Sequence, residues 1–316
     1  MKGVICLGEA LIDFIPLDNT NMTYQKCPGG APANVAVGVS KLGGKATFLG
    51  KVGKDILGEF LKETLDQNGV KTDYMLFTEE VRTGFTFVTL SKSGERSFSF
   101  YIDPSADRFL EVNDIDDKLF RENRILHFGS ISMIDEPAKS ATKKAVELAR
   151  KENMIVSYDP NLRLSLWKSK EQAKETIISM LDKCDVLKIS EEELEFITCE
   201  KDIENGIKKI EKYDIPLIFI TMGDKGSYFK FKDEIIKVPA MKVETVDTTG
   251  AGDAFVSGIL YCLNESEKQL NELTSDEIKQ IAKFASVSGG LAASTKGAMT
   301  SLPTLKQVKE ILNSTK

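Results

Sequence analysis

The chain lacks the side chains on which several familiar kinds of site depend. Its 316 residues include one histidine, His127, which excludes histidine-based catalytic triads and metal sites with several histidine ligands. Because His127 lies within an apolar run, we expect it in the core. No two of the five cysteines form a Cys-x-x-Cys pair, which speaks against a disulfide framework or a zinc knuckle. The sequence therefore favours reduced thiols in the cytoplasm at Cys6, Cys27, Cys184, Cys199 and Cys262.

An excess of basic residues and long apolar runs are also missing. The formal charge of −6 and the pI near 5.2 speak against a general affinity for nucleic acid or anionic membranes. The apolar start of the chain is interrupted by Glu9 and Asp13, so we expect no signal peptide. No later run reaches the roughly 20 residues that span a bilayer. These absences predict a soluble, cytoplasmic protein.

Two common nucleotide-binding motifs are absent as well. The chain has no Gly-x-x-x-x-Gly-Lys-[Ser/Thr] segment, which excludes a P-loop. Gly250-x-Gly252 lacks the third glycine of the dinucleotide-binding pattern, because Phe255 stands in its place. A phosphate site in this chain must therefore use another arrangement.

What the sequence does contain is an alternation of short apolar runs with amphipathic segments. The amphipathic segments predict helices at Pro137–Lys151, Glu171–Asp182 and Ile203–Tyr213. Strand and helix in alternation predict the α/β class, with a parallel sheet covered by helices on both faces. With 41% hydrophobic residues and no repeat or linker, we treat residues 1–316 as one domain. The apolar runs predict strands at Val4–Leu7, Thr47–Leu49, Ile125–Phe128, Ile155–Tyr158, Val186–Ile189 and Leu217–Thr221.

One region departs from this alternation. Thr83–Leu90 and Arg96–Tyr101 alternate small or polar residues with aromatic ones and flank a turn at 91–95, which predicts a hairpin. With the extended segments Phe14–Pro16 and Met22–Cys27, it predicts a small antiparallel sheet from about residues 13–28 and 83–103. We interpret this sheet as a lid over a site. An ordinary edge hairpin or a contact between two copies of the chain is the alternative that alternation alone favours.

The aromatic residues of the hairpin supply the surface that a lid needs. We place Phe98 and Phe100 on one hairpin face, together with Phe85 and Phe87 of the neighbouring strand. The free backbone groups at the edge of such a sheet also suit pairing with a second copy. A homodimer formed through the lid is therefore expected alongside closure.

The most informative segment runs from Val246 to Phe255 and leads into an apolar helix. Gly250, Ala251 and Gly252 leave backbone N–H groups uncovered, and the start of a helix adds its positive dipole end, which together form a cradle for an anion. Asp253 follows at the helix start, where we expect the dipole to keep it ionised and able to accept a proton from a hydroxyl. The alternative is an Asp that caps an ordinary helix.

A second glycine-rich segment begins at Pro28 and runs into a helix rich in Ala and Val. Gly29 and Gly30 permit close approach of a small ligand, and Asn34 offers both a donor and an acceptor to a sugar hydroxyl. Taken by itself, this segment equally fits a structural turn followed by a buried helix.

The two glycine-rich segments carry a family resemblance. GGAPANVAVG at Gly29–Gly38 and DTTGAGDAFVSG at Asp247–Gly258 resemble the two signature motifs of the ribokinase/pfkB carbohydrate kinases, in the same order and at a similar separation. The whole set looks most like the fructokinase branch. Further similar segments are Gly8–Phe14, Gly50–Gly58, His127–Ser132, Asp159–Trp167, Leu187–Thr198 and Thr221–Gly226.

The resemblance implies a ribokinase-like three-layer α/β/α sandwich with a β-sheet lid, which transfers the γ-phosphate of ATP to a sugar hydroxyl. It makes Asp253 the catalytic base, the Gly250–Asp253 amides the anion hole, and Arg163 a cation near the substrate or the transferred phosphate. The implied sugar contacts are Asp13, Gly29, Gly30, Asn34, Phe100 and Asp253. The implied nucleotide contacts are Lys188, Thr221, Gly223, Gly226, Gly250, Gly252 and Ser286.

The resemblance also implies ions. The family's Asn-x-x-Glu motif, associated with Mg²⁺, is here Ser190-Glu191-Glu192-Glu193, in which Glu193 can organise water bound to the metal. An exposed glutamate-rich turn is the alternative for Glu191 and Glu192. Many relatives carry K⁺ beside the anion hole, held mostly by backbone carbonyls. The positions that match its ligands are Asp247, Thr249, Ala292, Thr295, Gly297 and Ser301.

The acceptor is the least defined part of this expectation. Fructose is favoured by the resemblance, with 2-keto-3-deoxygluconate kinase and nucleoside or ribose kinases of the same family as alternatives. A sugar- or nucleotide-binding regulator that has lost turnover is the alternative of another class. The intact Gly250-Ala251-Gly252-Asp253 segment favours the enzyme.

Overall fold

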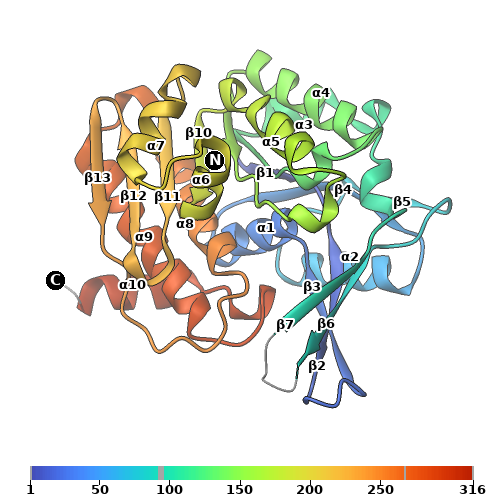
Figure 1. The fold of residues 1–316 in the computed structure, drawn as a ribbon. Helices are drawn as coiled ribbons and strands as arrows, with labels where there is room; N and C mark the ends of the chain where they lie inside the picture. The colour runs from blue at the N-terminus through green and yellow to red at the C-terminus, as the bar shows by residue number, and fades with distance from the viewer. Residues whose placement is uncertain (1, 92–95, 267, 315–316) are drawn as a thin grey trace.

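The computed structural model describes residues 2–91, 96–266 and 268–314 and shows three layers, with a large sheet between two layers of helices (Figure 1). The predicted α/β/α sandwich is therefore confirmed. The sheet has nine strands in the order β13-β12-β11-β10-β9-β8-β1-β4-β5. Their bounds are β1 (Val4–Leu7), β4 (Ala46–Gly53), β5 (Met75–Thr78), β8 (Ile125–Phe128), β9 (Ile155–Tyr158), β10 (Val186–Ser190), β11 (Leu217–Thr221), β12 (Ser227–Phe231) and β13 (Glu234–Val238).

The sheet is parallel from β5 to β11 and antiparallel beyond it. In β1, Val4 pairs with Ala46 of β4 and with Ile125 of β8, so β1 has a parallel neighbour on each side. All six predicted strands are present, and β4 and β10 extend beyond the predicted residues. The sequence reading missed β5, β12 and β13, of which β12 and β13 form an antiparallel hairpin at one edge.

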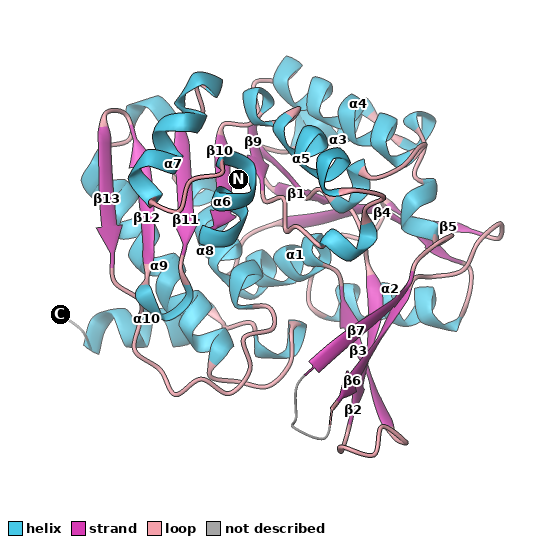
Figure 2. Cartoon of the chain, in the orientation of Figure 1, coloured by secondary structure: helices cyan, strands magenta, loops and turns pink. Residues whose placement is uncertain are grey.

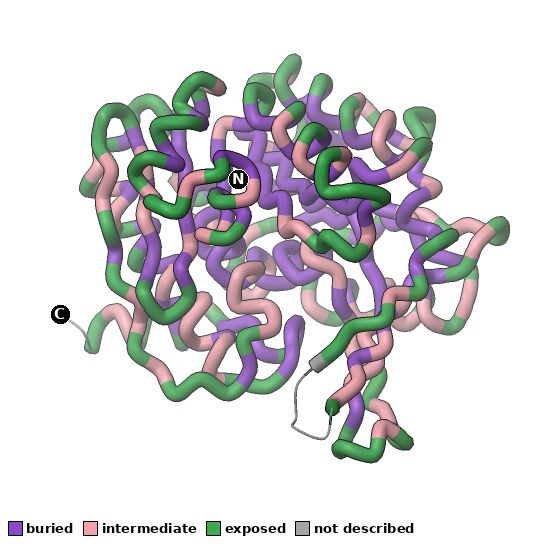
Figure 3. Tube along the Cα trace, viewed as in Figure 1, coloured by how far each residue is buried: buried purple, intermediate pink, exposed green. Residues whose placement is uncertain are grey.

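Two helical layers cover the sheet because its strands are apolar on both faces. In β1, Val4 and Cys6 belong to one buried cluster, whereas Ile5 and Leu7 belong to the other. Figure 3 shows the resulting buried centre. The first face is covered by α1 (Ala31–Lys41), α2 (Ile56–Gln67), α8 (Ala251–Glu265) and α9 (Ser275–Ala293), with α10 (Leu305–Ser314) packed on α9. The second face is covered by α3 (Asp117–Glu122), α4 (Ala138–Lys151), α5 (Lys170–Ile178), α6 (Glu191–Thr198) and α7 (Ile203–Ile210).

The predicted helices are found, but two of them end early. α5 ends at Ile178, where the Ser179 hydroxyl donates to the Thr176 carbonyl at 2.7 Å and so competes with the helical pattern. α7 ends at Ile210 and continues as a short 3₁₀ turn. α4 begins one residue after Pro137, which stands at its N-cap.

A second sheet of four strands projects from the main body (Figure 2). Its order is β3-β2-β6-β7, with β2 (Leu11–Pro16), β3 (Tyr24–Gly29), β6 (Phe85–Leu90) and β7 (Arg96–Tyr101). The prediction of a purely antiparallel sheet is wrong, because β2 and β6 pair in parallel. Between them the chain passes through the large sheet and returns in the same direction. Residues 92–95 of the predicted turn lie outside the described residues.

The pairing of β6 with β7 also corrects the expected placement of the aromatic residues. Thr86 lies opposite Phe100, and Val88 lies opposite Phe98, so these four side chains share one face. Phe85 and Phe87 therefore occupy the other face. Alternation was read correctly along each strand, but the register between the strands was not.

The remaining expectations concern His127, the cysteines and the membrane. His127 is buried, its Nδ1 lies 3.1 Å from the Ser157 hydroxyl, and burial lowers the pKa of its imidazole to about 4, which confirms a core residue. All five cysteines are free thiols. Within residues 2–91, 96–266 and 268–314, no helix has the length and apolar character to cross a membrane.

Candidate active site

The candidate site lies beyond the carboxyl ends of the parallel strands, where the two glycine-rich segments meet. β1 leads into Glu9 and β2, while β3 leads into α1 through Gly30. Gly30 has φ 101°, and a Cβ at this position would lie 2.4 Å from the Glu9 carbonyl oxygen. Only glycine fits this turn, which brings the start of α1 against the end of β1.

The start of α8 has the geometry expected of an anion cradle. Gly250 is the N-cap with φ 79°, and no side chain caps the helix, so its first N–H groups are not covered by a side-chain cap. A Cβ at Gly250 would lie 3.1 Å from the Cα of Ala298, which again restricts the position to glycine. Because Gly250 is the N-cap, Asp253 does not take that role.

Asp253 instead faces α1. The Asn34 amide donates to Asp253 Oδ2 at 2.7 Å, joining the two glycine-rich segments across 219 positions of sequence. Burial raises the pKa of Asp253 to about 6, against the Asn34 hydrogen bond, which favours the ionised form. With a pKa of about 6 the carboxyl group is still ionised at neutral pH, as expected, but burial narrows the pH range in which it is charged.

A cavity of about 660 Å³ opens in front of this pair. Gly29 is not among the residues that line this cavity. A Cβ at Gly29 would lie 2.4 Å from Asp13 Oδ2, so this glycine packs against the Asp13 side chain. The other predicted sugar contacts all line this cavity, as does Arg163 from an exposed loop. The predicted residues that line it are Asp13, Gly30, Asn34, Phe100, Arg163, Lys188, Thr249, Gly250, Gly252 and Asp253.

The cavity also contains residues that the sequence reading missed. Glu9, Thr86 and Asn161 line it, whereas Phe98, which also lines it, was expected there as part of the lid. Burial raises the pKa of Glu9 to about 8, although its carboxylate accepts the Ala31 N–H at 3.1 Å. Glu9 stands in the motif Gly8–Phe14, two residues after the end of a buried strand, and this position was the available signal.

Three acidic side chains, Glu9, Asp13 and Asp253, and two basic ones, Arg163 and Lys188, line the described part of the cavity. Burial raises the pKa of Asp13 to about 6, which the charge of Arg163 opposes. Lys188 forms a buried ion pair with Asp159 at 3.0 Å. Burial alone would lower the pKa of Lys188, but Asp159 and Glu193 reverse this and keep it raised. The Lys188 ammonium lies 3.4 Å from the place that a Cβ would occupy at Gly252, so a fixed cation borders the anion cradle.

A second cavity of about 680 Å³ lies on the other side of the cradle. Thr221, Gly223, Gly226 and Ser286 line it, as expected for one nucleotide site, and Gly252 does so as well. The predicted nucleotide contacts Lys188 and Gly250 line only the first cavity. Residues of this cavity that the sequence reading missed include Met241, Phe255, Gly289 and Gly290.

The two cavities meet at the start of α8. Thr248 and Gly252 line both of them. A group bound in one cavity and a group bound in the other can therefore approach each other directly in front of the Gly250–Gly252 amides. Such a junction is suited to the transfer of an anionic group to a hydroxyl placed beside Asp253.

Glu193 lies behind the cavities and lines neither of them. Its two carboxylate oxygens accept the Leu162 N–H at 2.7 Å and the Ser190 N–H at 2.8 Å. The second bond belongs to the capping box that begins α6, in which Ser190 Oγ accepts the Glu193 N–H. Ser190 therefore serves as a helix cap, and Glu193 positions the loop that carries Arg163.

The positions that match potassium ligands come from two segments, which Asp247 joins. Asp247 Oδ1 accepts the Thr249 hydroxyl at 2.7 Å, and Asp247 Oδ2 accepts the Gly297 N–H at 3.2 Å. The Ala292 carbonyl accepts the Thr295 N–H at 3.1 Å in the same region, and Ser301 ends the following turn. Oxygen atoms brought together in this way suit a hard cation. Among the described residues, no cluster of three or more His, Cys, Asp or Glu side chains forms a metal site.

Comparison with known proteins gives a consistent set of relatives. The sequence model of the pfkB family carbohydrate kinases matches residues 1–305. Probable fructokinase-6, chloroplastic, of Arabidopsis thaliana is 43% identical over 316 residues, which cover 98% of this chain and 82% of that protein.

Two solved structures are similar along their whole length. A fructokinase from Xylella fastidiosa with bound ATP superposes with a TM-score of 0.94 at 33% identity, covering 100% of this chain and 99% of that one. A fructokinase double mutant from Vibrio cholerae O395, in a form with fructose, ADP and potassium ion bound, gives a TM-score of 0.90 at 37% identity. This match covers 99% of the present chain and 98% of the other.

Replacing Asp253 by Asn should stabilise the protein at neutral pH. The folded-state pKa of about 6 lies above the ordinary 3.8, so stability that is present in acid is lost as the pH rises through 6. We expect Asp253→Asn to raise the free energy of unfolding by about 1–3 kcal/mol above about pH 7, and the gain to vanish below about pH 4. Urea unfolding at several pH values measures this. Asp233→Asn, at an exposed turn, is the control, and a gain that does not depend on pH would contradict the buried-charge explanation.

Proposed function

Because the chain belongs to the pfkB family of carbohydrate kinases, we propose that it phosphorylates D-fructose with ATP, giving fructose 6-phosphate and ADP. The observation that carries this proposal is the junction of two cavities at the start of α8, beside Asp253. The fructokinase relatives support the choice of sugar, since one is solved with ATP and another with fructose and ADP.

The proposed chemistry follows from the position of Asp253. The 6-hydroxyl of fructose attacks the γ-phosphorus, the bond to the oxygen that bridges the β- and γ-phosphates breaks, and Asp253 takes the hydroxyl proton. Asn34 holds Asp253 Oδ2 at 2.7 Å and so fixes the direction of the carboxylate. The Gly250–Gly252 amides and Lys188 stabilise the charge on the transferred group.

The two cavities divide the remaining roles. In the first, Asp13, Asn34 and Phe100 are the proposed sugar contacts, Gly30 lets the backbone approach the sugar, and Arg163 holds the phosphate end. In the second, the nucleotide lies between the loop of Thr221, Gly223 and Gly226 and the α9 residue Ser286. The nucleotide cavity is lined chiefly by small residues, which permits close contact with its backbone.

Two ions complete the proposal. Mg²⁺ would neutralise the nucleotide phosphates when bound. Glu193, behind the cavities, is the carboxylate proposed to orient water bound to this ion. K⁺ fits the oxygen-lined region around Asp247, whose carboxylate joins the segment before the anion cradle to the segment at Gly297. A cation there would order the loop that ends at Gly250.

The small sheet is proposed as a lid formed by about residues 13–28 and 83–103. Thr86, Phe98 and Phe100 face the sugar cavity, which would let the sheet exclude water from the phosphate. Its opposite face carries two stacked pairs of aromatic rings. The ring centroids of Phe85 and Tyr101 lie 4.9 Å apart, and those of Phe14 and Phe87 lie 5.1 Å apart. We propose that this aromatic face contacts a second copy in a homodimer.

The domain organisation, the compartment and the partners are properties of the whole chain. Residues from Glu9 to Ala298 line the sugar cavity, so we propose that residues 1–316 act as a single domain. The five free thiols favour the cytoplasm, although the Arabidopsis relative is named chloroplastic. With a net charge of −6, no nucleic-acid partner is proposed.

Asp253→Asn should abolish phosphoryl transfer while the fold and ATP binding persist. Loss of the general base alone costs roughly 10²–10⁴-fold in kcat. In the wild type, kcat should fall as the pH drops through about 6, because Asp253 becomes protonated. A coupled ADP assay with fructose, ribose, glucose, 2-keto-3-deoxygluconate and nucleosides measures this, with Asp233→Asn as the control. Turnover of another acceptor would redirect the proposal, and no turnover by the wild type would indicate a regulator.

Activity should rise when K⁺ replaces Na⁺ at constant ionic strength. The ion acts on the loop from Asp247 to Gly250 and so on the anion cradle, whereas Mg²⁺ acts on the nucleotide. Initial rates across a titration of each salt measure this, and Asp247→Asn should lose the response. Equal rates in both salts would remove the potassium site and leave the kinase proposal in place.

Fructose should slow hydrogen exchange in the lid strands. Closure over the sugar would protect the amides of Phe85–Leu90 and Arg96–Tyr101, which we expect to exchange several-fold more slowly at saturating fructose. The β13 strand, at the far edge of the large sheet, serves as the internal control. Unchanged protection of the lid strands would leave this sheet with a structural or dimer role alone.

A further inference from the structure

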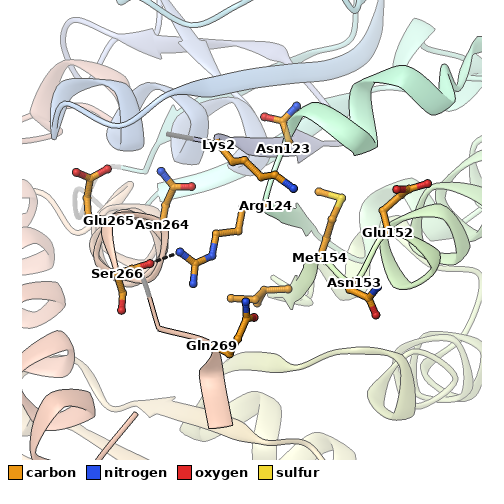
Figure 4. A pocket seen from close by; sticks show the side chains of 11 residues that line it. Lys2, Asn123, Arg124, Glu152, Asn153, Met154, Asn264, Glu265, Ser266 and Gln269 are labelled. Atoms are coloured by element: carbon orange, nitrogen blue, oxygen red, sulfur yellow. Dashed lines mark hydrogen bonds between the residues drawn. The ribbon is translucent and has the colours of Figure 1, made fainter. Parts of the chain in front are cut away.

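A third cavity, of about 530 Å³, lies at the other end of the sheet (Figure 4). Lys2 and Arg124 precede β1 and β8, and Met154 precedes β9, so these residues surround the amino ends of the parallel strands. Asn264 and Glu265 close the cavity from the last turn of α8. The helix begins at the active site and extends for about 22 Å over its 15 residues, so this cavity is separate from both cavities described above.

Asn264 is the unusual residue of this cavity. The residue is 5% exposed, and neither its amide nitrogen nor its amide oxygen has a hydrogen-bond partner among the described residues. Figure 4 shows the carboxamide turned toward the space beside Lys2. A buried carboxamide without partners lowers stability, and an apolar side chain of similar size would not. Because Asn264 also lines a cavity, a polar ligand bound there could supply the missing partners.

The charged groups around Asn264 are largely held by the protein itself. The Arg124 guanidinium donates to the Ser266 and Lys268 carbonyls, which follow α8. Glu152 lies 3.8 Å from Arg121. The formal charges of Lys2 and Arg124 also cancel those of Glu152 and Glu265. Among the described residues of this lining, the buried side-chain atoms without a partner belong to Asn264, whose carboxamide is neutral and offers a donor and an acceptor side by side.

We propose that this cavity is a second binding site, for an uncharged polyhydroxylated molecule of monosaccharide size. A carboxamide can accept a hydrogen bond from one hydroxyl and donate one to the hydroxyl next to it. Met154 and Ile155 offer an apolar wall to the carbon-bound hydrogens of a sugar ring. The two basic and two acidic side chains of the lining leave it without net charge, which favours an uncharged ligand over a sugar phosphate.

The methyl group of Met154 is a direct reporter of this site. The chain has nine methionines, and Met154 lines this cavity but neither cavity of the active site. The test is a titration of protein labelled with [¹³C-methyl]methionine, with D-fructose as the probe; this choice of sugar rests on the proposed function. The Met154 signal, assigned with Met154→Leu, should shift saturably in the wild type.

Asn264→Leu provides the decisive comparison. This variant should lose the Met154 shift or bind at least ten-fold more weakly, melt at a higher temperature without sugar, and keep the wild-type KM for the acceptor. Asn313→Leu, at an exposed position of α10, should leave the Met154 titration unchanged. Fructose 6-phosphate and glycine are titrated in parallel, as an anionic sugar and a zwitterion.

Each other outcome overturns the proposal. A Met154 shift that persists in Asn264→Leu would be an effect transmitted from the active site. No saturable shift, or a shift only with fructose 6-phosphate or glycine, would exclude an uncharged sugar. The readout needs no turnover, so a chain that binds fructose here but does not phosphorylate it would contradict the proposed function and leave this inference standing.

Discussion

The close contact between α1 and α8 is the constraint on which the candidate site depends. A Cβ at Gly38 would lie 2.1 Å from the Ser257 hydroxyl, so the two helices approach as near as a glycine allows. Ser257 donates to the Asp253 carbonyl at 2.6 Å within α8. One turn earlier, the same approach brings Asn34 to Asp253. The Asn34–Asp253 hydrogen bond is therefore set by the packing of two helices whose sequences lie far apart, and each helix begins at a glycine that a side chain would displace.

That packing buries several carboxyl groups. Burial raises the pKa of Glu9 to about 8 and the pKa values of Asp13 and Asp253 to about 6. The protein offsets this with Lys188 and Arg163 rather than with complete ion pairs for each acid. A carboxylate whose pKa is near the working pH can accept a proton and release it again, so the cost in stability and the capacity for catalysis have one origin.

The sequence allowed prediction of those parts of the fold that rest on local patterns. β1, β8, β9 and β11 lie at the predicted residues, because fully buried parallel strands are continuous apolar runs. Three features that depend on tertiary structure were not predicted. They are the parallel pairing of β2 with β6, the face shared by Thr86 and Phe100, and the position of Glu193 behind the site. Each depends on the register or depth of a segment, which periodicity does not specify.

The site residues show a related limit. The place of Asp253, Asn34 and Asp13 at the cavity could be predicted because each is a polar side chain within a recognisable motif, whereas the anion cradle and the oxygen-lined region at Asp247 consist largely of backbone groups. In the sequence such groups leave only small residues and glycines as a trace, as at Gly250, whose φ of 79° no larger side chain would readily adopt. Asn264 is the opposite case, since an asparagine in an apolar helix gives no signal until its burial is known. The start of α8 thus carries a candidate site that sequence motifs predict. Near its end, Asn264 can be related to a ligand only once its burial and its missing hydrogen-bond partners are known.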